Sequence, residues 1–240
     1  MSHTRTSSKA NLEGRSSAPA SEAVEDYAKA IYGLQRHEEG PITTSALAER
    51  LGVAPSSVTA MLKRLDEHRL VRYEPYHGVT LTAAGERVAL EVMRHHRLIE
   101  AFLADALEMP WDRVHDEAEV LEHYISEDLE RRIAEKLGNP AQDPHGDPIP
   151  TPELVMAADR TTALHRLAPG DAATFSRVSD SDPEMLRYLA ERGIRPGARL
   201  RVTEVQPFGG PVFVEVAERE HALGGGLARK MRVEREEARR

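Results

Sequence analysis

The sequence has no cysteine among its 240 residues. This excludes disulfide bonds, thiolate metal ligands, iron–sulfur clusters and cysteine nucleophiles, and it suits a cytoplasmic location. The chain also lacks a run of about 20 apolar residues that could span a membrane, and it lacks a signal-peptide core. Its 32 Lys and Arg against 40 Asp and Glu give a net charge of −8, which argues against a chain that is basic throughout. Because cysteine is absent, any metal must use nitrogen and oxygen ligands. The sequence contains 11 histidines that could supply nitrogen.

The beginning of the chain predicts a tail followed by three helices. Residues 1–21, rich in Ser, Thr and Ala, show no apolar periodicity, so we expect a disordered tail. Apolar residues then recur at three- and four-residue steps up to Leu34, which predicts a helix. Two more helices are predicted over 45–51, closed by Gly52, and over 55–65. A helix, a glycine-containing turn and a second helix form the order of a helix-turn-helix.

Residues 70–82 predict a β hairpin directly behind this motif. A wing in this position favours a winged helix-turn-helix DNA-binding domain over 22–90. The candidate DNA contacts lie on the helix predicted over 55–65, the second helix of the motif. The hydroxyls of Ser56, Ser57 and Thr59 could reach phosphates or base edges, and the cations Lys63 and Arg64 could pair with phosphates. The alternative is that Ser56 and Ser57 cap the helix and that the cations belong to an ordinary solvated face.

The middle of the chain predicts a helical domain over 91–140. A long helix is expected over 83–107, and two shorter helices are expected over 111–125 and 127–137. This domain contains 6 basic and 13 acidic residues, a net charge of −7, whereas residues 41–90 carry +1. The acidity of the chain is therefore concentrated outside the expected DNA-binding unit.

The end of the chain predicts a linker and a small β barrel. The linker over 141–168 is rich in Pro, Asp and Gly and is expected to contain one short helix near 152–159. Residues 169–240 are expected to form the barrel around one helix over 183–192. Its strands are expected over 172–178, 199–205, 212–216 and 230–233. The expected fold class is α+β.

The acidic segment contains a pattern typical of metal binding. His115, Glu119, Glu122 and His123 share one stripe of a helix, because they stand at i, i+4, i+7 and i+8. His96 and Glu100 form an i, i+4 pair on the preceding helix, and antiparallel packing would bring the two stripes together. Clustered carboxylates cost free energy unless a cation neutralises them. The alternative is a solvent-exposed face rich in Glu and His, but the two stripes together favour a divalent metal site.

Three stretches carry a resemblance to a known family: Ala48 to Leu51 continuing through Val58-Thr59, Met93 to Leu98, and above all Val114 to His123. With the loop Gly146 to Pro150, they resemble the diphtheria-toxin-repressor family of metal-dependent transcriptional regulators. The likeness covers residues 22–155, and residues 169–240 more loosely resemble the family's SH3-like, FeoA-like domain. The resemblance implies a homodimer on a palindromic operator and no enzymatic activity.

Carried over by position, the resemblance implies two metal sites per subunit. The regulatory site would use Asp26, Glu119, Glu122 and His123. The ancillary site would use His96, Glu100 and His115. Iron-responsive members place Met and Cys where this chain has Asp26 and Glu119. The hard donor set therefore favours Mn(II), with Fe(II) as the alternative.

The chain departs from the family pattern at several positions. Lys29 stands where short manganese-responsive relatives have a bridging Glu, so their two-metal arrangement is not carried over. Ala60 replaces a DNA-contacting Gln, so no operator sequence can be transferred. Asp182 and Glu184 fall near the position where longer relatives add ancillary ligands. Asp182 is equally suited to cap a helix that begins at Pro183.

The sequence thus predicts a manganese-dependent repressor that controls metal homeostasis, with no membrane partner. One alternative is an iron-dependent repressor of the same family. A second is a winged-helix regulator gated by an organic ligand, and a third is a metal-dependent hydrolase. The hydrolase is disfavoured because no nucleophile or proton-transfer partner accompanies the ligands, which already fill the sites. The sequence leaves three roles open for the C-terminal barrel: supplying metal ligands, steadying the dimer or binding a Pro-rich segment.

Overall fold

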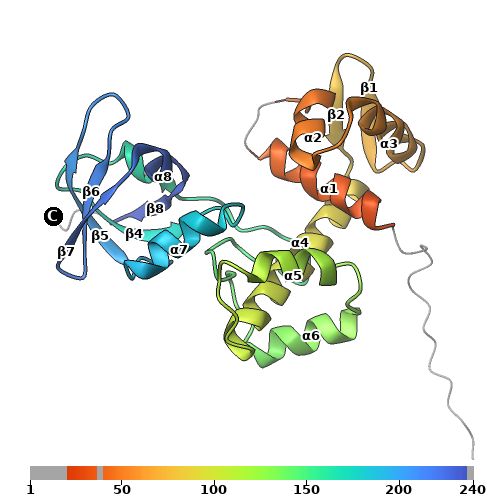
Figure 1. Cartoon of the computed structure of the whole chain (residues 1–240). Coiled ribbons are helices and arrows are strands. Elements are labelled where there is room, and N and C mark those ends of the chain that lie inside the picture. The colour runs from red at the N-terminus through yellow and green to blue at the C-terminus, as the bar shows by residue number, and fades with distance from the viewer. Residues whose placement is uncertain (1–20, 37–39, 237–240) are drawn as a thin grey trace, which may run out of the picture.

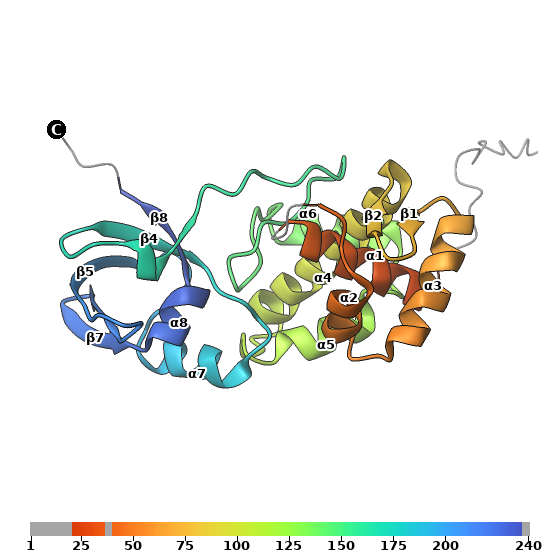
Figure 2. The same cartoon turned by 90° about the horizontal axis from the view of Figure 1, so that it is seen from above.

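The computed structural model describes residues 21–36 and 40–236. The predicted disordered tail, apart from Ser21, lies outside these residues. The described chain has an N-terminal helical half with a small wing and a C-terminal part built on a six-stranded sheet (Figures 1 and 2). The predicted α+β fold is confirmed. Among the described residues, no helix combines the length and apolar character needed to cross a bilayer.

The N-terminal unit is a winged helix. It comprises α1 (Glu22–Gln35), α2 (Thr44–Leu51), α3 (Pro55–Glu67), β1 (Val71–Glu74) and β2 (Gly78–Leu81). Helix α2 is capped at its start by Thr43, whose Oγ1 accepts a hydrogen bond from the amide of Ala46, and at its end by Gly52, which has a φ of 66°. Ile31, Leu47 and Leu62 are fully buried in its core, and each such side chain contributes about 1.5–3 kcal/mol. The predicted helix-turn-helix and wing are therefore confirmed.

Helix α4 (Ala83–Ala106) connects the wing to the helical middle of the molecule (Figure 1). Its start packs closely on the wing, because a Cβ at Gly85 would lie 1.9 Å from the carbonyl oxygen of Leu70. Helix α1 packs along α4, and α5 (Val114–Leu121) and α6 (Glu127–Lys136) pack on the other part of α4.

Helix α5 is shorter than the predicted helix over 111–125. Glu122 and His123 lie just beyond its end, in the turn that leads to α6. The carbonyl oxygen of Glu122 lies 3.2 Å from Nδ1 of His95 on α4, so a side chain takes the place of the next helical hydrogen bond. This contact between helices ends α5 early, and periodicity alone does not reveal it.

The linker crosses α4 without forming the helix predicted over 152–159, so that prediction was wrong. Residues 152–153 form a turn and Leu154 has a φ of 61°. The linker is bound to α4 through its carbonyl groups, since Nη1 of Arg94 donates to the oxygen of Pro150 at 2.6 Å and Arg97 donates to that of Pro148. Arg94 and Arg97 of α4 thus hold the extended segment directly before residues 152–159 through its backbone carbonyls.

The C-terminal unit is an SH3-like antiparallel sheet with the order β3-β8-β4-β5-β6-β7. Its elements are β3 (Thr162–Ala163), the 3-10 turn η1 (Leu164–Arg166), β4 (Ala172–Arg177), α7 (Pro183–Glu191), β5 (Arg199–Val205), β6 (Val212–Val216), β7 (Arg219–Leu223), α8 (Gly225–Lys230) and β8 (Arg232–Arg235). Three predicted strands and the helix are confirmed within one residue. The strand predicted over 230–233 begins two residues later, after α8, and β3 and β7 were not predicted.

Candidate metal centre and DNA-binding surface

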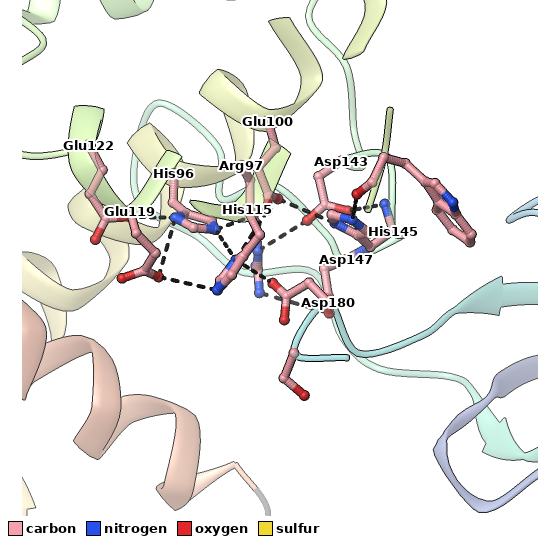
Figure 3. Close-up of polar contacts among 12 residues, drawn as sticks. His96, Arg97, Glu100, His115, Glu119, Glu122, Asp143, His145, Asp147 and Asp180 are labelled. Atoms are coloured by element: carbon pink, nitrogen blue, oxygen red, sulfur yellow. Dashed lines mark hydrogen bonds and ion pairs between the residues drawn. The ribbon is translucent and has the colours of Figure 1, made fainter. Parts of the chain in front are cut away.

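Helices α1, α4 and α5 bring most of the predicted metal ligands together. Helix α4 supplies His96 and Glu100, and α1 supplies Asp26. The other predicted ligands lie on α5 and in the turn after it: His115, Glu119, Glu122 and His123. Figure 3 shows His96 between Glu119 and Glu122 on one side and Glu100 and His115 on the other. The two stripes predicted from spacing therefore face each other.

The first cluster consists of Asp26, His96, Glu119, Glu122 and His123. Glu122 is its centre, with a fully buried side chain that lies 2.5 Å from Nδ1 of His96 and 3.6 Å from Nε2 of His123. Nε2 of His123 lies 3.2 Å from Oδ1 of Asp26, which connects α1 to this centre. Asp26, Glu122 and His123 offer donor atoms within 4.8 Å of one another, and so do His96, Glu119 and Glu122. These oxygen and imidazole donors fit a hard divalent cation.

His123 has a further partner that sequence reasoning missed. Its Nδ1 lies 2.5 Å from Oε2 of Glu25 on α1. A carboxylate on one ring nitrogen orients the imidazole and leaves the other nitrogen for a metal. Glu25 is therefore suited to position His123 toward Asp26 and Glu122.

The second cluster consists of Glu100, His115, Asp143, His145 and Asp180. Oε1 of Glu100 lies 3.4 Å from Nδ1 of His115, and Oε2 lies 3.5 Å from Nδ1 of His145. Asp180, on the loop after β4, lies 3.1 Å from Nδ1 of His115 and brings the C-terminal unit to the site. His96 also reaches this cluster, because its Nε2 lies 3.1 Å from Glu100. The predicted set of His96, Glu100 and His115 is thus brought together.

Buried polar atoms of the second cluster lack ordinary hydrogen bonds. Both carboxylate oxygens of Glu100 and Nδ1 of His145 are buried without a partner of normal hydrogen-bond geometry among the residues described. Nε2 of His145 donates to the carbonyl oxygen of Trp111 at 2.7 Å, so Nδ1 is the nitrogen that faces Glu100. Buried polar atoms without partners are costly. A metal ion between these atoms would satisfy them.

The electrostatics of the clusters also fit a cation. Burial lowers the pKa of His96 and His145, but the facing carboxylates outweigh it and raise both to about 9. Asp180 and Glu100 raise the pKa of His115 to about 10. Burial raises the pKa of Asp26. These imidazoles therefore bind protons tightly, and a metal ion would have to replace those protons.

The structure does not bring Asp182 or Glu184 into either cluster. Oδ1 of Asp182 accepts a hydrogen bond from the amide of Met185 at 3.1 Å, so this residue caps α7. Asp180, two residues earlier, takes the expected place beside His115. Asp143, His145 and Asp180 were not predicted as part of the site. The loop Gly146 to Pro150 directly after His145 was the only signal nearby.

The predicted DNA-contacting residues lie on one face of α3. Ser56, Ser57, Lys63 and Arg64 are exposed, whereas Thr59 is half-buried and donates its hydroxyl to the carbonyl of Pro55. Ala54 occupies the N-cap position without a side-chain hydrogen bond, so the two serines do not cap the helix. A groove between α2, α3 and the wing includes Thr59 and Lys63 in its lining. This surface presents free hydroxyls and cations, as a phosphate-contacting face requires.

An apolar face lies on α5, α6 and the turn between them. Val120, Tyr124 and Leu129 are 62%, 71% and 45% exposed, and Leu121 is 39% exposed. Exposed apolar side chains on neighbouring elements are typical of protein interfaces. The face is suited to pair with a second copy of the chain.

Comparisons with known proteins agree with this geometry. Family models of the iron dependent repressor match residues 20–79 as the N-terminal DNA binding domain and 82–151 as the metal binding and dimerisation domain, and the FeoA domain model matches 162–235. The chain is 30% identical over 226 residues to the iron-dependent repressor IdeR of Mycobacterium leprae, which spans 89% of this chain and 97% of that protein.

Two solved structures extend the comparison. A manganese-dependent transcriptional repressor in complex with manganese has 41% identity and a TM-score of 0.82, covering 89% of this chain and all of that one. The manganese regulator SloR has 32% identity and a TM-score of 0.71, covering 89% and 98%. The whole described architecture, including the C-terminal unit, is therefore shared with these proteins.

Proposed function

Because the chain belongs to the iron-dependent repressor family, whose members are metal-dependent, DNA-binding transcriptional repressors and not enzymes, we propose that its corepressor is Mn(II). The observation that carries this proposal is the donor set of the first cluster. Asp26 and Glu119 supply carboxylate oxygens beside Glu122 and His123, and no sulfur ligand is present among these residues. Hard oxygen and imidazole donors suit Mn(II), whereas sulfur donors favour softer ions. Fe(II) is the alternative corepressor.

The residues of the first cluster connect two parts of the molecule. Asp26 lies on α1, which packs against the helix-turn-helix, whereas Glu119, Glu122 and His123 belong to the helical middle. A bound divalent ion would supply positive charge and coordinate bonds between these parts. Joint ligation would fix α1 relative to α4 and α5, and with them the spacing of two winged helices in a dimer. Such a dimer suits a palindromic operator, because its two-fold symmetry matches two half-sites.

We assign the domains by function along the chain. Residues 22–90 bind DNA, residues 91–140 bind metal and dimerise, residues 141–168 form the linker and residues 169–240 form the FeoA-like domain. The middle domain carries −7, so metal uptake would also reduce its repulsion of the DNA backbone. Regulation of this kind operates in the cytoplasm, on genes of metal homeostasis.

The second cluster is our candidate for a second metal ion in each subunit. Its ligands would come from two overlapping donor groups that share Glu100. One group is His96, Glu100, His115 and Asp180, and the other is Glu100, Asp143 and His145. Asp180 lies in the C-terminal unit and His145 in the linker. Ligation here would join the C-terminal unit to α4, so the FeoA-like domain would supply ligands to this site.

Operator binding with defined metals tests the proposal. A binding sequence would first be selected from a random duplex library with Mn(II)-loaded protein. Affinity would then be measured by fluorescence anisotropy with Mn(II), with Fe(II) under anaerobic conditions, and with chelator. We expect tight binding with Mn(II), weaker binding with Fe(II) and loss with chelator. Stronger activation by Fe(II) would favour the iron alternative, and binding that ignores metal would favour gating by an organic ligand.

A further inference from the structure

Lys29 places a cation inside the first cluster. Its Nζ, on α1, lies 2.7 Å from Oε1 of Glu119, 2.9 and 2.8 Å from the two carboxylate oxygens of Glu122, and 3.3 Å from Nδ1 of His96. The Lys29 side chain is 21% exposed and Glu122 is fully buried. These contacts use the same oxygen and nitrogen atoms that would bind the proposed metal.

The ammonium group and a metal ion cannot both use these atoms well. A metal ion lies about 2.0–2.6 Å from a carboxylate oxygen. A metal bound to the Glu119 and Glu122 oxygens would therefore lie within about 5 Å of Nζ, where like charges repel strongly. Both cations also need the lone pairs of the Glu119 and Glu122 oxygens. Coordination of the metal thus requires Lys29 to give up these contacts.

Resting on the proposed function, we infer that Lys29 is an internal competitor of the metal and sets the metal concentration at which the protein responds. Lys29 and Asp26 are three residues apart on α1, so one helix face presents both a competing cation and a metal ligand. When no metal is bound, Lys29 joins α1 directly to Glu119 and Glu122, while Asp26 contacts His123 instead. When metal is bound, the Lys29 contacts would be lost, and an ion ligated by Asp26 would join α1 to the same carboxylates.

Removal of the charge has two separate effects. Without Lys29, the neighbouring carboxylates of Glu119 and Glu122 lose their cation, so metal-free protein becomes less stable. The metal no longer has to displace an ammonium group that makes charge-assisted hydrogen bonds, so it binds more tightly. A hydrogen bond to a charged group contributes roughly 1.5–3 kcal/mol, which corresponds to about a tenfold to hundredfold gain in affinity.

The test compares Lys29→Met with the wild type and with Lys136→Met, an exposed lysine at the end of α6. Mn(II) binding would be measured by calorimetry and by the electron paramagnetic resonance signal of free Mn(II). Thermal unfolding would be followed with chelator and with Mn(II). We expect Lys29→Met to bind Mn(II) at the first cluster at least about tenfold more tightly. Its melting temperature should be lower in chelator and should rise more on Mn(II) addition.

Two further variants keep the outcome decisive. Lys29→Arg retains the charge and should bind Mn(II) no more tightly than the wild type, and Lys29→Gln replaces Lys29→Met if the latter does not fold. Unchanged or weaker Mn(II) affinity in folded Lys29→Met or Lys29→Gln would overturn the inference while leaving the proposed function intact. Absence of Mn(II) binding in the wild type would instead refute the proposed function.

Discussion

At the scale of single residues, His123 is the proposed ligand whose loss should separate metal binding from folding. Its Nε2 faces Asp26 and its Nδ1 contacts Glu25, while its side chain is only 8% exposed. Replacement of even a residue that only supports a ligand lowers the metal affinity by roughly 10- to 100-fold. We therefore expect His123→Ala to weaken Mn(II)-dependent operator binding by about 100-fold or more, measured by anisotropy.

The matched control for His123→Ala is His165→Ala, because His165 is exposed on η1. It should leave metal-dependent DNA binding unchanged. Circular dichroism of both variants should match the wild type. Retention of wild-type Mn(II) response by His123→Ala would remove His123 from the site.

Trp111 gives an optical signal for the second cluster. It is the single tryptophan, it is 3% exposed, and its ring stacks on His145 with a centroid distance of 5.8 Å and an interplanar angle of 20°. Paramagnetic Mn(II) bound at Nδ1 of His145 would quench its fluorescence. We expect quenching in the wild type and in His123→Ala, but little in Glu100→Gln, which keeps the shape of the side chain and removes its charge. Equal quenching in Glu100→Gln would contradict a metal site here.

At the scale of elements, α3 should bind DNA mainly through phosphate contacts of Lys63 and Arg64. Both are exposed on the α3 face, and Lys63 also lines the groove next to the wing. Each phosphate contact adds roughly one unit to the slope of log affinity against log salt concentration. We expect Lys63→Ala and Arg64→Ala each to reduce that slope by about 1, whereas Lys136→Ala on α6 should not change it. An unaltered slope in both variants would place the DNA contacts elsewhere.

The elements that the sequence predicted correctly are those whose residues carry a local signal. Helices α2 and α3 combine apolar periodicity with Gly52 or Pro55 at their ends, and β5 and β6 were predicted with their observed bounds. Strand β3 has only two residues and β7 is mostly polar, so neither has such a signal. These strands form because β8 and β6 pair with them.

The candidate site shows the same division between local and distant signals. The stripe from His115 to His123 was found because helical spacing places its residues on one side. His145 and Asp180 lie in irregular segments, where no period marks them. Their meeting at Glu100 depends on how the linker and the C-terminal unit pack against α4, and such long-range packing has no counterpart in local sequence.

At the scale of the whole molecule, the C-terminal unit is attached by more than its linker. Trp111, which precedes α5, packs into the apolar core of the sheet unit, and Arg195 of that unit lies over its ring. Arg177 on β4 pairs with Asp147 and with Asp159 of the linker. Asp180 adds a carboxylate at the second cluster. Metal binding there would therefore act on a contact between units that already exists through packing and ion pairs.

Asp159 makes this attachment dependent on pH. Burial raises the pKa of its carboxyl, but hydrogen bonds from Thr161 and the guanidinium of Arg177 at 2.6 Å outweigh burial and hold the pKa well below the usual 3.8. A pKa lower in the folded than in the unfolded protein gives stability that is present above about pH 4 and lost as the pH falls through the folded value. Asp159→Asn should therefore lower the melting temperature at pH 5–7, measured in chelator, and the deficit should narrow steadily below about pH 4. A deficit that stays constant down to the acid limit of folding would show that the ionised carboxylate does not provide the stability.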